Sequence, residues 1–292
     1  MAQTPSPYIT LAQRIAAPEL LIVPGVHDMI AAKLARKVGF DVLYGSGFWL
    51  TASAHGLPDA GIVGYAEMHE RIARLVKVSG ATVIADADTG YGGLLNVHHT
   101  VRGFEEAGAA AIQIEDQVFP KKCGHTPNRQ VVSAEEMADK IRVACEARQN
   151  RDTLIIARTD SRESEGLSRS IDRAQLYAEA GADMLFVEAL HDVDEMRIAC
   201  SEIAAPMMAN MSNGGYTPML GASELLDIGY SAAIYPALSG LASTDAIERA
   251  YQELMEKGDP RPTQVGLADF RDFCNMIGFP EIWAFDAKWA RG

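Results

Sequence analysis

The sequence of residues 82–116 is TVIADADTGYGGLLNVHHTVRGFEEAGAAAIQIED. Two apolar runs, 82–85 and 110–114, flank a stretch at 97–106 whose apolar residues recur with helical spacing. A buried strand, a connecting helix and a second buried strand form a parallel β-α-β unit. The first run ends in Asp86-Ala-Asp88 and the second in Glu115-Asp116, so this unit places carboxylates at the ends of both strands.

The same pattern of apolar run, polar ending and helix-like stretch occurs eight times along the chain. The runs are residues 20–23, 42–44, 82–85, 110–114, 154–157, 184–187, 207–209 and 232–235. Their endings, in the same order, are Gly-Val-His-Asp, Gly-Ser-Gly, Asp86-Ala-Asp88, Glu115-Asp116, Arg158-Thr-Asp160, Glu188, Asn210-Met-Ser212 and Pro236. Eight repeats predict an α/β fold of the (β/α)8 TIM-barrel type, with an open, doubly wound sheet as the alternative. In a barrel the polar endings line one active site.

The 292 residues suit one barrel domain over 1–292. Two segments are longer than barrel connections need, 45–65 and 118–132, and the second is expected to be a loop that moves over the active site. Residues 258–292 form a predicted C-terminal helical extension. Because this tail contains Trp283 and Trp289, we expect it to pack on a neighbouring helix or on another subunit.

Composition excludes several classes of protein. Lys and Arg total 26 against 39 Asp and Glu, and the net charge of −13 argues against nucleic acid as a partner. No apolar run reaches the roughly 20 residues of a membrane span, and the N-terminal residues lack the pattern of a signal peptide. The four cysteines are scattered without a CxxC pair, which indicates a reducing cytoplasm and neither disulfides nor structural zinc.

The acidic residues at the strand ends form one candidate cluster with Asp59, which lies in the first long segment: Asp59, Asp86, Asp88, Glu115 and Asp116. Carboxylates crowded at one rim repel each other unless a cation joins them, and oxygen ligands favour Mg²⁺ or Mn²⁺ over zinc. The cluster therefore predicts a divalent metal site. The alternative is that these acids cap helices or carry solvated rim charges.

The second long segment contains Lys121-Lys-Cys-Gly-His125. Neighbouring Lys and His cations stabilise a thiolate, so the pKa of Cys123 is expected to be lowered toward neutrality. Such a thiol can act as a general acid or base, or as a nucleophile with His125. The alternative is an exposed basic loop with an incidental cysteine.

Three later strand endings supply Arg158, Glu188, Asn210 and Ser212. Arg158 offers a bidentate fork and the amide and hydroxyl offer neutral donors, which together predict a carboxylate-binding group oriented by Glu188. The alternative is a structural layer of ion pairs. Ser46-Gly47 offers donors for a second carboxylate. His27-Asp28 either reaches the site or caps the first helix, and the glycine-rich stretch 89–93 is interpreted as a flexible rim loop rather than a phosphate cradle.

Several of these segments resemble one known family. The stretches are Asp86-Ala-Asp-Thr-Gly-Tyr-Gly92, Ile114-Glu-Asp-Gln117, Lys121-Lys-Cys-Gly-His125, Ile156-Ala-Arg-Thr-Asp160 and Phe186-Val-Glu-Ala189. They resemble the isocitrate lyase/phosphoenolpyruvate mutase superfamily, over roughly residues 24–254. The cysteine segment resembles the lyase branch, which includes methylisocitrate and 2,3-dimethylmalate lyases.

The resemblance implies a Mg²⁺-dependent lyase that cleaves a 2-hydroxy di- or tricarboxylate by retro-Claisen chemistry. It implies metal binding by Asp86, Asp88, Asp59 and Glu115, and catalytic roles for Cys123, Lys121, His125, Arg158 and Glu188. The implied substrate-binding residues are Ser46, Gly47, Gly124, Arg158, Phe186, Asn210 and Ser212. It also implies a homotetramer whose C-terminal helix is swapped between subunits, as the aromatic tail suggests.

The substrate stays open between 2-methylisocitrate and an alkylmalate such as 2,3-dimethylmalate. Phe186 matches the methylisocitrate lyases, but those usually have an Arg after the eighth strand where this chain reads Pro236-Ala-Leu-Ser-Gly-Leu-Ala242. Oxaloacetate decarboxylase and phosphonate mutase or hydrolase activities on the same scaffold are the alternatives, and they do not need Cys123. A non-catalytic homologue would tolerate loss of Asp86 and Arg158.

Overall fold

The computed structural model describes residues 10–290 and contains eight parallel strands. They are β1 (Leu21–Val26), β2 (Val42–Gly45), β3 (Thr82–Asp86), β4 (Ala111–Glu115), β5 (Leu154–Thr159), β6 (Met184–Val187), β7 (Met208–Asn210) and β8 (Ala232–Tyr235). They pair in the order β6-β5-β4-β3-β2-β1-β8-β7. Between β6 and β7, Leu185 forms a parallel bridge with Met207 and donates its amide hydrogen to the carbonyl of Pro206 at 2.9 Å. The sheet is a nearly closed barrel, so the predicted TIM barrel is confirmed and the open sheet is wrong.

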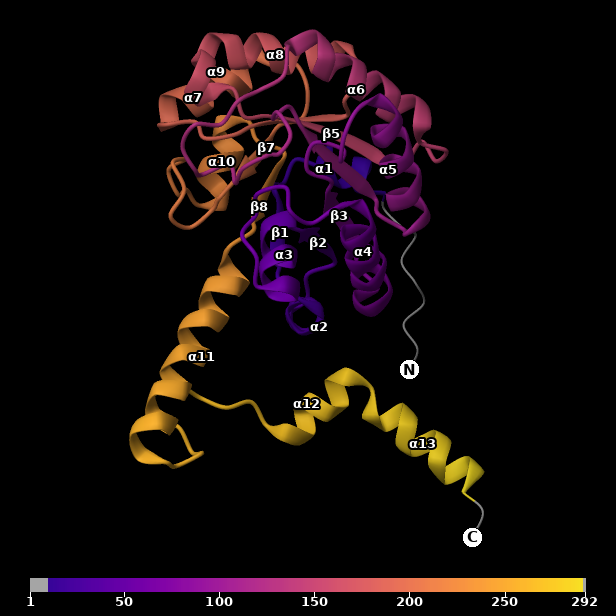
Figure 1. The fold of residues 1–292 in the computed structure, drawn as a ribbon, viewed down its shortest axis with the longest axis vertical. Coiled ribbons are helices and arrows are strands. Elements are labelled where there is room, and N and C mark those ends of the chain that lie inside the picture. The colour runs from indigo at the N-terminus through magenta and orange to yellow at the C-terminus, as the bar shows by residue number, and fades with distance from the viewer. Residues whose placement is uncertain (1–9, 291–292) are drawn as a thin grey trace. The chain divides into compact units, whose positions relative to one another are not determined.

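The second to tenth helices alternate with these strands and surround the barrel (Figure 1), whereas Leu11 and Ile15 of the first helix join its interior core. Up to the eighth strand the helices are α1 (Leu11–Ile15), α2 (Met29–Val38), α3 (Gly47–His55), α4 (Tyr65–Ser79), α5 (Leu94–Glu106), α6 (Ala134–Ala147), α7 (Arg162–Glu165), α8 (Leu167–Glu179), α9 (Val193–Glu202) and α10 (Ala222–Ile228). After it come α11 (Leu238–Lys257), α12 (Phe270–Ile277) and α13 (Phe279–Trp289).

Local sequence sets several helix ends. The Asp28 carboxylate accepts a hydrogen bond from the amide of Ala31 at 2.7 Å, so of the two sequence interpretations for Asp28 the structure shows the helix cap, at α2. Ser133 caps α6 in the same way through the amide of Glu136. Gly39 ends α2 with a φ of 117°, a left-handed conformation that glycine adopts without steric cost.

Side chains alternate along each strand between two apolar cores. In β5, Leu154 and Ile156 face the barrel interior, where they join one buried cluster, and Ile155 and Ala157 join a second cluster beneath the helices. The same alternation holds for β6, where Phe186 faces the interior and Leu185 faces the helices. Because the period is two, the next inward position after Ile156 belongs to a polar residue at the strand end.

The chain divides into two compact units, one ending at Ser239 and one beginning at Gly240. The first contains all eight strands, and the second contains most of α11 together with α12 and α13. This boundary lies earlier than residue 258, where the predicted extension begins. The organisation of residues 1–292 as one domain and the swapping of the extension between subunits stay predictions.

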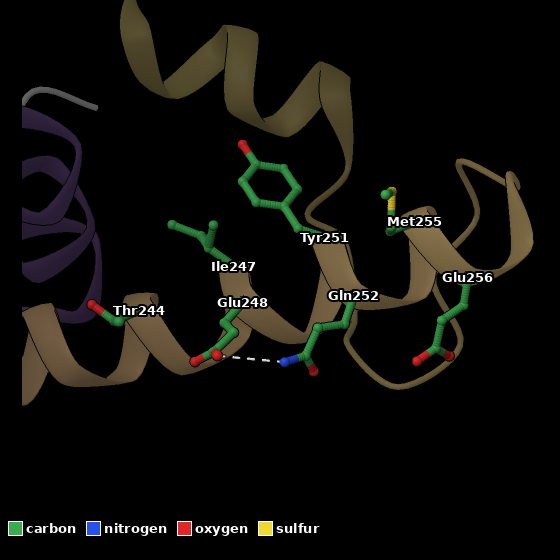
Figure 2. Close-up of a pocket in the computed structure, with 7 residues that line it drawn as sticks. All are labelled: Thr244, Ile247, Glu248, Tyr251, Gln252, Met255 and Glu256. Atoms are coloured by element: carbon green, nitrogen blue, oxygen red, sulfur yellow. Dashed lines mark hydrogen bonds between the residues drawn. The ribbon is translucent and has the colours of Figure 1, made fainter.

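The second unit exposes many apolar side chains. Tyr251 and Met255 line a shallow hollow of about 740 Å³ on α11, which Figure 2 shows together with the hydrogen bond from Gln252 to Glu248. In α13 the rings of Phe285 and Trp289 lie 6.3 Å apart, and both are more than half exposed. Among residues 10–290, no helix combines the length and the apolar character needed to cross a membrane.

Candidate active site

The polar residues at the strand ends form a layer above the inward-facing apolar core. Alternation continues from Ile84 to Asp86, from Ala111 through Gln113 to Glu115, and from Ile156 to Arg158. In the same way it leads from Phe186 to Glu188 and from Met208 to Asn210. These charged and amide side chains are buried, and they enclose one region at the carboxyl ends of the strands, as expected for a TIM barrel.

A buried lysine lies in the middle of the acidic cluster. The ammonium nitrogen of Lys121 is 2.7 Å from Oδ2 of Asp59, 2.8 Å from Oδ1 of Asp88 and 3.9 Å from Oε1 of Glu115. Burial disfavours the ammonium ion, but the surrounding carboxylates outweigh that effect and raise the pKa of Lys121 well above its ordinary value. Lys121 therefore stays charged and joins carboxylates that would otherwise repel.

Asp86 is fixed by backbone and side-chain donors. Its Oδ2 accepts from the amide of Gly47 at 3.0 Å, and its Oδ1 accepts from the amide of Asp88 at 3.1 Å and from the side chain of Gln113 at 3.4 Å. A Cβ on Gly47 would lie 3.1 Å from carboxylate oxygens of both Asp86 and Asp88. The neighbouring Ser46 precedes α3 and is buried. The Ser46-Gly47 turn thus contacts the acidic cluster directly.

The donor set of this cluster fits a hard divalent cation. Both carboxylate oxygens of Glu115 are buried without a hydrogen bond within residues 10–290. Burial raises the pKa of Asp88, whose Oδ1 lies against the Lys121 ammonium, to about 7. Oxygen atoms of this kind are the ligands that Mg²⁺ and Mn²⁺ take in proteins. In the described part of the chain, no three His, Cys, Asp or Glu side chains are arranged as a formed metal site. Lys121 occupies the space among the oxygens instead.

Arg158 is held in a ring of carboxylates. Its Nε and Nη2 donate to Asp160 at 3.0 and 2.9 Å in a bidentate fork, while Nε lies 3.5 Å from Glu115 and Nη2 lies 3.3 Å from Glu188. The guanidinium carbon is 5.0 Å from the centre of the Phe186 ring. The arginine is therefore oriented by four neighbours before any substrate arrives.

A second group of contacts joins strand ends β6 and β7. Asn210 donates to Oε2 of Glu188 at 2.9 Å, and the other oxygen of Glu188 accepts from the amide of Ala189 at 2.8 Å. The ring of His125 lies 3.5 Å from the same Asn210 amide nitrogen. Ser212 is buried in the turn after β7. The structure thus brings His125 from the long loop together with two strand-end residues.

The long loop packs directly on Arg158. A Cβ added to Gly124 would overlap Nη2 of Arg158. Only glycine allows this approach, so the backbone that directly follows Cys123 lies against the arginine. The prediction that the pKa of Cys123 is lowered is wrong: burial raises it. Burial of the thiol outweighs the lowering of its pKa by the His125 amide, Lys121 and Arg158, and the Asp59 carboxylate adds to the rise. The Lys122 ammonium donates instead to the carbonyl of Asn128.

Sequence reasoning missed a layer of supporting residues. Asp160 accepts the two hydrogen bonds of the Arg158 fork. Asp116 in turn accepts from the amide of Asp160 at 2.9 Å and from the hydroxyl of Tyr177 at 2.8 Å. Asp116 therefore supports Asp160 rather than lying in the acidic cluster with which it was grouped. Gln113 links Asp86 to the hydroxyl of Tyr44, to which its Oε1 is bonded at 2.9 Å. Strand alternation is a signal that could have placed Gln113 inside the barrel.

Comparison with known proteins is consistent with this site. A sequence model of the family described as phosphoenolpyruvate phosphomutase matches residues 11–255. A 2-methylisocitrate lyase of Aeropyrum pernix is 41% identical over 98% of this chain and 92% of its own. A 2,3-dimethylmalate lyase of Eubacterium barkeri is 38% identical over 97% of this chain and 98% of its own.

Solved structures of related proteins share this fold. A crystal structure of 2,3-dimethylmalate lyase, described as a PEP mutase/isocitrate lyase superfamily member, superposes with a TM-score of 0.89 at 32% identity and covers 97% of both chains. A phosphonopyruvate hydrolase in complex with oxalate and Mg²⁺ superposes with a TM-score of 0.86 at 28% identity, over 96% of this chain and 98% of the other. The family model, the identities and the shared barrel lead to one conclusion: this chain belongs to the phosphoenolpyruvate mutase/isocitrate lyase superfamily.

Proposed function

We propose that the protein is a Mg²⁺-dependent carbon–carbon lyase. It cleaves a 2-hydroxy di- or tricarboxylate, either 2-methylisocitrate or an alkylmalate such as 2,3-dimethylmalate, into a 2-oxo acid and a second carboxylate. The observation that carries the proposal is the close approach of Gly124 to Arg158, because Gly124 directly follows Cys123 and so ties the cysteine loop to the proposed carboxylate-binding cation. The names of the relatives at 41% and 38% identity support the same reaction class.

Asp86, Asp88, Glu115 and Asp59 would hold the metal, with Mn²⁺ as an alternative to Mg²⁺. When bound, the divalent cation would polarise the 2-hydroxy acid end of the substrate. For the oxygens of Asp88 and Asp59 to reach a metal, the Lys121 ammonium must move away from them. Lys121 then remains close enough to stabilise negative charge at the same rim.

The chain's own residues stabilise the negative charge that develops on the substrate. The substrate hydroxyl passes its proton to a carboxylate of the acidic cluster, the adjacent C–C bond breaks, and the bonding pair moves onto the carbon next to the leaving carboxylate. That product is an enediolate dianion, which Arg158, Asn210, Ser212 and His125 stabilise as fixed donors. Glu188 keeps Asn210 and Arg158 oriented through its contacts at 2.9 and 3.3 Å. Ser46 and Gly47 would supply donors for the second carboxylate once the Gly47 amide leaves Asp86, to which it donates, and Phe186 packs against Arg158.

Cys123 supplies the final proton to the carbanion carbon. Because burial raises its pKa, the side chain is a neutral thiol at pH 7, which is the form an acid needs. This assigns the cysteine the role of general acid rather than nucleophile. A decarboxylase or a phosphonate mutase or hydrolase on the same scaffold would not need the thiol.

The proposal is tested with a panel of substrates: 2-methylisocitrate, isocitrate, 2,3-dimethylmalate, 2-ethylmalate and oxaloacetate. Each is incubated with the protein and Mg²⁺, the 2-oxo acid is measured, and the assays are repeated with EDTA and with Cys123→Ser. Cleavage of a hydroxy acid that needs both metal and cysteine supports the lyase, and the best substrate settles its branch. Turnover of oxaloacetate alone, unaffected by Cys123→Ser, contradicts it.

The proposal includes a cytoplasmic homotetramer. The apolar side chains that the second unit exposes, among them Phe285 and Trp289, support burial against other subunits. Light scattering of the purified protein measures the mass of the assembly directly. A monomer at micromolar concentration would contradict this part of the proposal.

A further inference from the structure

The loop that carries Cys123 is paired at its base. Gln117 and Val131 form an antiparallel bridge, and the amide of Val118 donates to the carbonyl of Gln130 at 2.8 Å. The outgoing and returning arms of the loop are thus joined where they leave the barrel. A contact made by the returning arm therefore also restrains the outgoing arm, on which Cys123 lies.

The outgoing arm has its own brace. The side chain of Gln117 donates to the carbonyl of Lys122 at 2.9 Å and accepts from the amide of the same residue at 2.9 Å. This pair of bonds fixes the backbone immediately before Cys123. The brace holds the arm to the base of the loop, and the ammonium of Lys121 ties the same arm to Asp59 and Asp88. The returning arm has a separate contact with the strand ends.

Arg129 supplies that contact from the returning arm. Its side chain is only 1% exposed, its Nη2 lies 3.2 Å from Glu163, and its Nε lies 3.9 Å from Oδ1 of Asp160. None of Nε, Nη1 and Nη2 makes a hydrogen bond within residues 10–290. A buried cation of this kind is costly unless opposite charges are close. The two carboxylates therefore hold Arg129 through charge rather than through hydrogen-bond geometry.

Asp160 faces both Arg129 and Arg158. The same Oδ1 that lies 3.9 Å from Arg129 accepts from Nη2 of Arg158 at 2.9 Å. Asp160 is held in place independently of both arginines, because its amide donates a hydrogen bond to Asp116, which also accepts one from Tyr177. The two arginines lower the pKa of Asp160 against the opposing effect of burial. One fixed carboxylate thus joins a loop cation to the substrate-binding cation.

We propose that Arg129 is a positioning residue, which acts through the Asp160 carboxylate to hold the Cys123 loop in register with Arg158. The inference rests on the proposed lyase function, in which Arg158 binds the departing carboxylate and Cys123 protonates the carbon beside it. The distance between thiol and carbon then depends on where the loop lies relative to Arg158. Loss of Arg129 slows the proton transfer more than it weakens substrate binding, because Arg158 keeps its other partners.

The test compares the full-length wild type with Arg129→Met, Arg129→Lys and the control Lys122→Met. Lys122 is an exposed cation of the same loop, and its ammonium donates to the loop carbonyl of Asn128 at 3.1 Å. Two quantities are measured: kcat and KM with the best substrate of the panel, and the rate at which iodoacetamide alkylates Cys123 without substrate, followed by peptide mass. Circular dichroism and thermal melting establish that each variant is folded.

Arg129→Met is expected to lower kcat by about 100-fold, as for a displacement of roughly 1 Å at a reacting group, and to change KM by less than about threefold. Its Cys123 is expected to react at least about fivefold faster, since the loop opens more often. Arg129→Lys keeps kcat within about fivefold of the wild type because the charge remains. Lys122→Met resembles the wild type in both quantities.

Two results overturn the inference. One is an Arg129→Met variant that matches Lys122→Met in both kcat and alkylation rate. The other is an equal loss in Arg129→Met and Arg129→Lys, which assigns the effect to packing of the side chain rather than to its charge. If the wild type cleaves no substrate of the panel, the proposed function fails, while the alkylation rates still decide the role of Arg129.

Discussion

The ammonium nitrogen of Lys121 lies 2.7 Å from Oδ2 of Asp59, although 62 positions separate the two residues along the chain. The same ammonium is 2.8 Å from Asp88, so a loop residue neutralises carboxylates that come from two other connections. A divalent cation would use the same oxygens. Lys121 and the metal therefore compete for one region of the site, and this competition can be measured.

Lys121→Met is expected to bind Mg²⁺ more tightly than the wild type and to turn over more slowly. Removing a positive charge a few ångströms from the metal removes a repulsion worth several kcal/mol at an effective dielectric constant of about 20, so we expect a gain in affinity of at least about tenfold. Isothermal titration calorimetry measures the affinity, with Lys122→Met as the control for loss of an exposed loop cation. An unchanged or weaker affinity in Lys121→Met would sink the prediction.

Alkylation of Cys123 is expected to report its raised pKa. The thiolate is the reactive form, so a raised pKa means slow reaction with iodoacetamide at pH 7.5 and a rate that continues to rise above pH 9. Turnover shows the opposite pH dependence. Deprotonation of Cys123 removes the acid, so kcat falls as the pH rises through the thiol pKa. The urea-unfolded chain is the control. A rate that levels off below pH 8 in the folded protein would contradict the assignment.

Gly124→Ala is expected to remove most of the activity with little loss of stability. The added methyl group overlaps the guanidinium of Arg158, so either the loop or the arginine must shift, and a shift of roughly 1 Å at reacting groups costs on the order of 100-fold in rate. Gly266→Ala is the matched control because its Cβ would meet no atom within 4 Å. Kinetics and thermal melting are measured for both variants. Full activity in Gly124→Ala would show that the loop does not need this close approach.

Asn210→Leu is expected to weaken both stability and catalysis. The amide donates to the buried carboxylate of Glu188 at 2.9 Å, and leucine keeps the volume but removes the donor. Loss of one donor to a buried charged group costs about 1–3 kcal/mol. Urea denaturation and kcat/KM are measured, and Asn210→Gln serves as the variant that keeps an amide. Equal stability in Asn210→Leu and the wild type would mean that Glu188 finds another donor or a proton.

Gly25→Ala is expected to destabilise the barrel by about 1–3 kcal/mol or more, as overpacking of a tight contact does. A Cβ on Gly25 would overlap the backbone of Pro236 and lie 2.8 Å from its carbonyl oxygen. Backbone atoms cannot turn away as a flexible side chain can, so the strands β1 and β8 must separate. Thermal melting is the measurement, and Gly266→Ala is again the control. An unchanged melting temperature would contradict this account of the contact.

The sequence predicts the barrel and much of the site because both depend on local patterns. Runs that end in polar residues mark the strand ends, and strand alternation carries Arg158, Glu188 and Asn210 to the same interior face. The acidic residues also group Asp59 of the first long segment with the strand ends, and the structure brings it there through Lys121. These features need no knowledge of how the loops fold.

The features that the sequence does not predict depend on loop conformation and burial. The pKa of Cys123 is raised rather than lowered because the loop buries the thiol, and burial outweighs the lowering effect of Lys121 and Arg158. The hydrogen bonds by which Asp116 supports Asp160 could not be predicted from the sequence either, since they depend on Tyr177 of α8 contacting the end of β4. Charge spacing along the chain cannot show either arrangement.

The alternation of side chains along β5 and β6 has a consequence for how such a protein can change over generations. Residues that face the helices pack the core, and those at the strand ends form the proposed site, so the two are inherited at separate positions of one short strand. A lineage can replace a strand-end residue such as Asn210, at a cost of about 1–3 kcal/mol of stability, while Ala209 and Val187 still pack as before. Selection can thus change the carboxylic acid that is bound one side chain at a time, as long as the barrel stays stable enough to fold.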